Sequence, residues 1–168
     1  MSEALELRAR VRDDIAAIEA LRTGPYAPPW AGCANPGRSA SGEDFAVVAL
    51  RVSEDFYGAD DDGERMAAAH EAFETERWGV VLALDERWGR HGELSTAAYE
   101  EREAEGRDVP PFFAALSELG LSGELQTWDT DGRTDGRTDG RTVGIGVGQM
   151  DREEPVVLFA VALATLTG

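Results

Sequence analysis

The chain has few of the residues and motifs that form common catalytic, metal and nucleotide sites. It has one cysteine, Cys33, and two histidines among 168 residues. A single cysteine excludes an internal disulfide framework and predicts a reducing compartment. The sequence has no P-loop, no Gly-x-Ser-x-Gly nucleophile elbow and no Cys-x-x-Cys pair. These absences favour a binding protein over an enzyme, and no cofactor or metal is predicted.

Long hydrophobic runs are missing as well. The longest apolar stretch, 156–166, has eleven residues, whereas a helix needs about 20 to cross a bilayer. The N-terminus lacks the basic and apolar regions of a secretory signal. We therefore expect a cytoplasmic protein.

Positive charge is scarce, and lysine is absent. The chain has 33 acidic residues against 16 basic ones, all arginine, for a net charge of −17. A chain of this charge is not expected to bind nucleic acid through phosphate contacts or to approach an anionic membrane. It can attract a basic protein and speed their encounter. The alternative is that the acidity serves solubility alone.

The length predicts one domain spanning 1–168, large enough to bury about 70% of its unfolded surface. Its clearest pattern lies in the last third. Three strand-like segments, 124–128, 142–150 and 156–166, are separated by turn residues. They predict an antiparallel meander. The predicted fold is therefore α+β, with a three- to four-stranded antiparallel sheet and helices packed mainly on one face.

The segment 130–141 repeats Thr-Asp-Gly-Arg three times and is predicted to form a long hairpin tip. Asp-Gly favours a two-residue turn, because both central residues need positive φ. A turn at Asp135-Gly136 places Trp128 opposite Val143. The same register puts Glu124 and Gln126 on the apolar face of the sheet, a conflict that the sequence leaves open.

The strand 143–148 alternates β-branched residues with Gly144, Gly146 and Gly148. Its bare face predicts close packing by a helix or a large aromatic side chain. The alternative is a small-ligand or minor enzyme site on this face beside Trp128. A dinucleotide site is excluded, because no helix follows the glycines.

Two long helices are expected. Apolar residues at spacings of three and four predict a helix over 3–21, capped by Ser2. A second interpretation gives a strand over 5–11 and a helix from Asp13. That opening resembles acetyltransferases of the GNAT type, although their Gln/Arg-x-x-Gly-x-Gly/Ala cofactor loop is absent.

The second long helix is predicted over 63–88. Gly79 is unfavourable inside a helix by about 1 kcal/mol, so the alternative is a strand over 79–84. Shorter helices are expected over 95–105 and 110–119, each followed by a glycine.

Segment 45–52 predicts a strand that is apolar on both faces. It follows a loop over 24–42 that is rich in proline and glycine. Tyr26 and Trp30 lie in this loop. They are expected either to attach it to the core or to form a patch that contacts a partner.

The segment 54–76 holds nine acidic residues against Arg65 alone, a charge of 1 − 9 = −8. An aromatic centre with an acidic rim suits a basic target. The sequence thus predicts a non-enzymatic module, in its sharpest form an immunity protein or antitoxin that neutralises a basic toxin; a homodimeric structural subunit is a further alternative. The predicted partner-binding residues are Asp60, Asp61, Asp62, Glu64, Tyr26 and Trp30.

Candidate reactive residues are few. Cys33 would need His70 or His91 as a base to become a nucleophile, and nothing in the sequence brings them together. His70 and Glu74 share a helix face, but no third metal ligand accompanies them.

Overall fold

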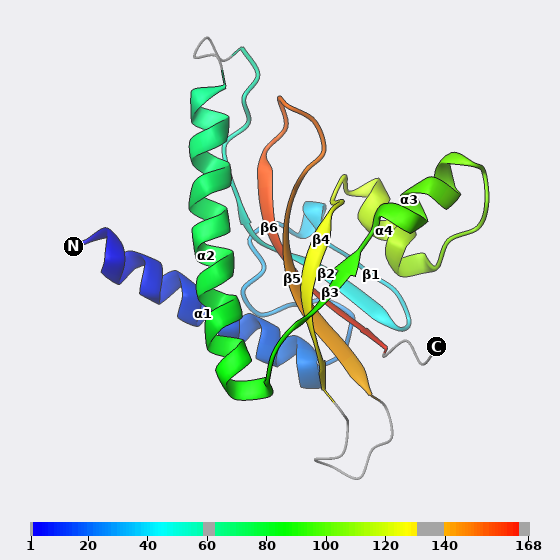
Figure 1. Cartoon of the computed structure of the whole chain (residues 1–168), viewed down its shortest axis with the longest axis horizontal. Helices are drawn as coiled ribbons and strands as arrows, with labels where there is room; N and C mark the ends of the chain where they lie inside the picture. The colour runs from blue at the N-terminus through cyan, green and yellow to red at the C-terminus, as the bar shows by residue number, and fades with distance from the viewer. Residues whose placement is uncertain (1, 59–62, 131–139, 165–168) are drawn as a thin grey trace.

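The computed structural model describes residues 2–58, 63–130 and 140–164 (Figure 1). Its strands form one antiparallel six-stranded sheet in the order β1-β2-β6-β5-β4-β3. The helices are α1 (Glu3–Thr23), η1 (Pro36–Arg38), α2 (Glu64–Trp88), α3 (Ala97–Ala104) and α4 (Pro111–Glu118). The strands are β1 (Ala40–Ser41), β2 (Phe45–Val52), β3 (Gly92–Ser95), β4 (Glu124–Thr130), β5 (Arg141–Gln149) and β6 (Val156–Ala164).

The α+β class is confirmed, but the predicted sheet of three to four strands is wrong. The described residues form six strands, and helices cover both faces of the sheet rather than mainly one. The two missed strands, β1 and β3, have two and four residues, too few to show a periodic pattern. The apolar segment at the start of β2 did indicate that both faces of the sheet are covered, because its first six residues are all buried.

The C-terminal meander has the predicted register. Trp128 pairs with Val143, and Gln126 pairs with Ile145. Gln126 does face the apolar side, where it is buried and its Oε1 accepts a hydrogen bond of 2.6 Å from Arg77 Nε. This bond resolves the conflict in the predicted register. The predicted tip at Asp135-Gly136 lies outside the described residues.

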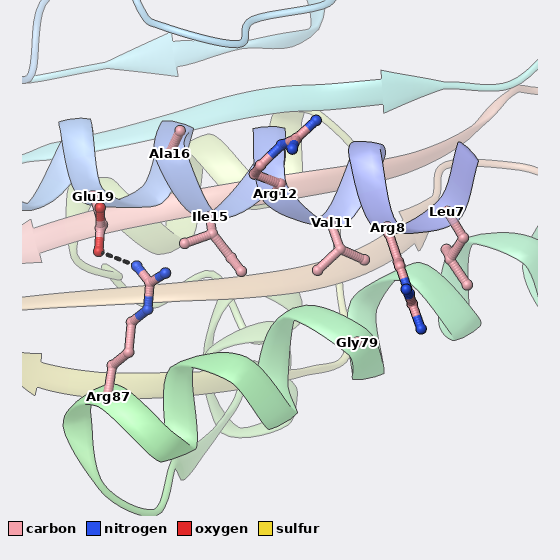
Figure 2. Close-up of a pocket in the computed structure, with 9 residues that line it drawn as sticks. All are labelled: Leu7, Arg8, Val11, Arg12, Ile15, Ala16, Glu19, Gly79 and Arg87. Atoms are coloured by element: carbon pink, nitrogen blue, oxygen red, sulfur yellow. Dashed lines mark hydrogen bonds and ion pairs between the residues drawn. The ribbon is translucent and has the colours of Figure 1, made fainter. Parts of the chain in front are cut away.

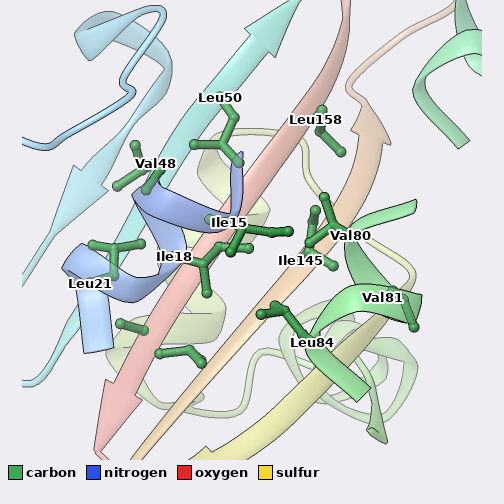
Figure 3. Close-up of a cluster of buried hydrophobic side chains, with 14 of the residues drawn as sticks. Ile15, Ile18, Leu21, Val48, Leu50, Val80, Val81, Leu84, Ile145 and Leu158 are labelled. Carbon is green, nitrogen blue, oxygen red and sulfur yellow. The ribbon is translucent and has the colours of Figure 1, made fainter. Parts of the chain in front are cut away.

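The helices α1 and α2 cover one face of the sheet, here called the helix-pair face. α1 is helical from Glu3, and the Leu5 amide donates to the Ser2 hydroxyl at 3.3 Å. The interpretation of 5–11 as a strand, and with it the GNAT-like opening, is therefore wrong. Figure 3 shows the resulting core. Its labelled side chains are Ile15, Ile18, Leu21, Val48, Leu50, Val80, Val81, Leu84, Ile145 and Leu158.

α2 runs unbroken to Trp88, so the alternative strand over 79–84 is wrong. Gly79 lies where α1 crosses α2. A Cβ atom at this position would lie 2.9 Å from Val11 Cγ2. The absence of a side chain thus permits the two helices to approach closely, which offsets the poor helix propensity of glycine.

The opposite face of the sheet, here called the α4 face, is covered by α4 and the residues that follow it. Phe112, Phe113 and Leu116 pack with Leu121 against the β6 side chain of Phe159. α3 joins this layer through Tyr99, whose ring stacks on Phe113 with centroids 3.5 Å apart. No described helix combines the length and apolarity needed to cross a bilayer.

Candidate functional site

Two acidic segments meet at one end of the sheet, at the top of Figure 1. One is 53–58, which follows β2, and the other is 150–155, which joins β5 to β6. The Phe56 amide donates to the Glu153 carbonyl at 2.8 Å, and the Ser53 amide donates to the Val156 carbonyl at 2.9 Å. These backbone bonds make one surface from segments about 100 residues apart in the chain. We call it the acidic end.

The acidic end carries exposed apolar groups among unpaired carboxylates. Tyr57 is 58% exposed and Met150 is 53% exposed. Asp55, Asp151 and Glu153 are exposed in the same two segments, and no described cation pairs with any of the three. Large exposed apolar side chains are informative when polar groups surround them, because such patches mark interaction sites.

Hydrogen bonds hold Tyr57 in place. Its hydroxyl donates to Glu154 Oε1 at 2.5 Å, and Arg38 Nη2 contacts Glu154 Oε2 at 3.3 Å. The hydrogen bond to Glu154 raises the pKa of Tyr57 to about 12. The bonds from Tyr57 and Arg38 lower the pKa of Glu154. At neutral pH the phenol is therefore a fixed donor, with much of its ring presented to solvent.

The predicted partner-binding residues are only partly assembled. Glu64 is exposed at the start of α2, whereas Asp60, Asp61 and Asp62 lie outside the described residues. Tyr26 and Trp30 are half-buried and pack on the helix-pair core. The Trp30 indole donates to the Tyr26 carbonyl at 2.7 Å.

Tyr26 also lies far from the acidic end. The Arg141 guanidinium lies 4.2 Å from the centre of the Tyr26 ring, and Arg141 begins β5. Gln149, at the other end of β5, contacts His70 in α2 at 3.0 Å. The nine residues of β5 span roughly 30 Å. The structure therefore does not bring Tyr26 together with Glu64.

The glycine strand is part of the core. A Cβ atom at Gly146 would lie 2.7 Å from Phe159 Cζ, and one at Gly148 would lie 3.1 Å from Leu121 Cα. Both glycines face the α4 side, whereas Trp128 packs in the core of the helix-pair face. The described structure therefore separates Trp128 from Gly144, Gly146 and Gly148, and side chains of the protein occupy the glycine face.

The end of α2 carries an Asp–His pair that the sequence did not reveal. Asp85 accepts hydrogen bonds from the Trp128 indole at 3.0 Å, the His91 amide at 2.8 Å and His91 Nδ1 at 3.0 Å. Burial raises the pKa of Asp85, but the bonds from His91 and Trp128 outweigh it and lower the pKa overall. No hydroxyl or thiol among the described residues bonds to His91. The pair therefore connects β4 to α2 and lacks a nucleophile.

The other reactive candidates are also dispersed. Cys33 Sγ lies 3.5 Å from Ser39 Oγ, and His70 contacts Gln149 rather than a thiol. No group of three or more potential metal ligands occurs in the described ranges. The predicted His70–Glu74 pair thus gains no third ligand there.

A buried carboxyl pair lies between α1, α2 and β2. Asp14 is 4% exposed and Glu76 is 2% exposed. Glu76 binds Arg51 at 3.0 Å and Arg10 at 3.3 Å, whereas Asp14 Oδ2 has no partner. Burial, and then the neighbouring Glu76, raise the pKa of Asp14 to about 9. Asp14 is therefore neutral at pH 7.

A groove of about 510 Å³ runs along the outer side of the α1–α2 crossing (Figure 2). Leu7, Val11 and Ile15 supply apolar lining from α1, and Gly79 supplies lining from α2. Arg8 and Arg12 also line this groove. We call it the α1–α2 groove.

Comparisons with protein-family models, with curated proteins and with solved structures find no match to this chain.

Proposed function

We propose that this chain is a non-enzymatic module of the bacterial cytoplasm that binds a basic protein through its acidic end. In the most specific form it is an immunity protein or antitoxin that covers the positive site of a toxin. The supporting observation is that the two segments of the acidic end expose Tyr57 and Met150 together with the unpaired carboxylates of Asp55, Asp151 and Glu153.

This arrangement suits a protein partner on physical grounds. Tyrosine is a common interface anchor and methionine adapts to varied apolar surfaces. Anionic side chains around them attract a cationic partner and speed its approach, and the net charge of −17 acts in the same direction. The hydrogen bond from Tyr57 to Glu154 fixes the ring before binding, which lowers the entropy cost of association.

The acidic end takes over the role expected of the loop over 24–42. Tyr57, rather than Tyr26 or Trp30, is the exposed aromatic beside the acidic residues. Asp60, Asp61 and Asp62 follow Tyr57 within the same connection of the sequence. In this proposal they add to the negative charge of that connection.

The test is affinity capture from a lysate of the native cell, at about 50 mM and about 500 mM salt, because salt screens exposed charges. The bait is compared with D55R/E153R. We expect one basic protein to bind the unaltered bait at low salt, to be lost at high salt and to be lost from the variant. Purified complex is then used to measure the association rate.

The matched control is E100R/E101R, which makes the same change in net charge on exposed residues of α3. It should retain the partner. A partner lost equally from both variants would show that only overall charge matters, and a partner retained by both would show that the acidic end is not its binding site. No captured basic protein at either salt would contradict the proposal.

A further inference from the structure

The α1–α2 groove has a lining unlike the rest of this acidic surface. Its apolar wall comes from Leu7, Val11 and Ile15. Figure 2 shows Val11 and Ile15 pointing from α1 toward α2, with Arg8 extending beside Gly79. A volume of about 510 Å³ lies within the roughly 300–1,000 Å³ typical of small-ligand sites.

The charged side chains that line this groove are mainly arginines, and two of them have no ion-pair partner among the described residues. The side chains of Arg8 and Arg12 form no hydrogen bond or ion pair with any described residue. By contrast, Arg87 at the same groove binds Glu19 at 2.6 Å. In a chain with 33 acidic and 16 basic residues, carboxylate partners are abundant, so two unpaired arginines beside an apolar wall provide a local site for an anion.

We propose that the α1–α2 groove binds a small amphiphilic carboxylate, with its alkyl chain on the apolar wall and its head group at Arg8. Arginine matches a carboxylate because its guanidinium can donate two parallel hydrogen bonds. Arg12, one helical turn further along α1, adds to the positive charge of the groove lining. The alkyl chain replaces water on Val11 and Ile15, which is favourable in proportion to the apolar area covered.

The length of the groove suits one alkyl chain. The lining of α1 extends from Leu7 to Glu19, a rise of roughly 18 Å at 1.5 Å per residue. The groove is built on two packed helices, and the absence of a side chain at Gly79 lets them cross closely there. It does not involve the acidic end, so this proposal and the proposed partner binding can fail separately.

The test uses dodecanoate below its micelle concentration, titrated into the full chain while methyl and backbone NMR shifts are recorded. Saturable shifts confined to Val11, Ile15 and their neighbours are expected. Acetate, which has the head group alone, should give no such shifts. Dodecyltrimethylammonium is the informative contrast, because non-specific binding to a chain of charge −17 favours the cation over the anion. The groove should prefer dodecanoate.

The variant R8E/R12E should weaken dodecanoate binding by about tenfold or more, since it removes two exposed charge contacts and adds repulsion. The control R102E/R107E reverses two exposed arginines away from the groove and should leave binding unchanged. Equal loss in both variants, or tighter binding of the cationic amphiphile, would overturn the proposal. So would a dimer in sedimentation whose interface protects Val11 and Ile15, because a second copy would then occupy the groove.

Discussion

The two faces of the sheet are packed by different means. On the helix-pair face, α1 and α2 carry the buried ionisable residues of the described chain, Asp14, Glu76 and Arg77. On the α4 face, the core residues are aromatic and aliphatic, and glycines of β5 make room for Phe159. The same sheet thus has one partner layer positioned by ionic groups and another positioned by shape.

The position of a helix on the sheet and the burial of its apolar side chains therefore have different causes. Apolar side chains can slide over one another at modest cost, whereas a buried ion must keep its partners. Arg77 contacts Gln126 and the Glu124 carbonyl on β4, so α2 has one favourable position along the sheet. Among the described residues of the α4 face no buried charged side chain imposes such a constraint, and the volume of its side chains determines its packing.

The largest expected effect comes from replacing Arg77, which positions α2 on the helix-pair face. R77M removes hydrogen bonds to Gln126 at 2.6 Å and to Glu124 O at 2.5 Å and leaves Gln126, 3% exposed, without its partner. We expect the free energy of unfolding to fall by about 2–4 kcal/mol, because the Gln126 side chain and the Glu124 carbonyl both lose a charged donor. Urea denaturation followed by circular dichroism measures it.

The double variant R77M/Q126L should recover part of this loss, because it removes the unsatisfied amide of Gln126 and leaves only the Glu124 carbonyl without its Arg77 donor. A single-variant loss below about 1 kcal/mol would show that water satisfies Gln126 in place of Arg77.

The next effect depends on pH. The pKa of Asp14 is raised from 3.8 to about 9 on folding, so between these values the folded chain binds more protons than the unfolded chain. Stability from this group is complete below about pH 3.8 and is lost as the pH rises through about 9. Its slope cannot exceed about 1.4 kcal/mol per pH unit. D14N should remove this slope, which amounts to at most about 3 kcal/mol between pH 6 and pH 8.

The measurement is the difference in unfolding free energy between the unaltered chain and D14N at several pH values. Glu76, Arg51, Arg10 and Asp13 surround Asp14, so the variant D13N serves as the control for a nearby exposed charge. Parallel curves for the unaltered chain and D14N would show that Asp14 is already ionised in the folded state.

Local patterns predicted the elements well, and long-range contacts explain what they missed. The register of Trp128 against Val143 followed from the Asp-Gly turn and the alternation of β5. The acidic end depends on contacts between 53–58 and 150–156, which no periodicity encodes. Asp14 gave a weak signal, because a carboxyl falls one turn before the core residue Ile18 on an apolar helix face.

A smaller effect is expected on the α4 face, where the volume of the side chains determines the packing. G146A would place a Cβ atom 2.7 Å from Phe159 Cζ, and overpacking of this kind costs about 1–3 kcal/mol. Thermal unfolding of G146A and of G146A/F159L measures it, and the smaller Leu should relieve part of the strain. G92A is the control, because its Cβ atom would meet only ordinary contacts, the nearest at 3.5 Å. Equal losses in G146A and G92A would contradict the role assigned to Phe159.

The smallest effect concerns an ion pair that joins α1 to α2 at the surface. Arg87 and Glu19 lie 2.6 Å apart, with side chains 52% and 44% exposed. Water already solvates both charges, so R87Q should cost only about 0.2–1 kcal/mol, and less at high salt. Unfolding in urea at low and high salt measures this change. A loss comparable to that of R77M would mean that ion pairs position α2 wherever they occur, rather than only where burial leaves them no alternative partner.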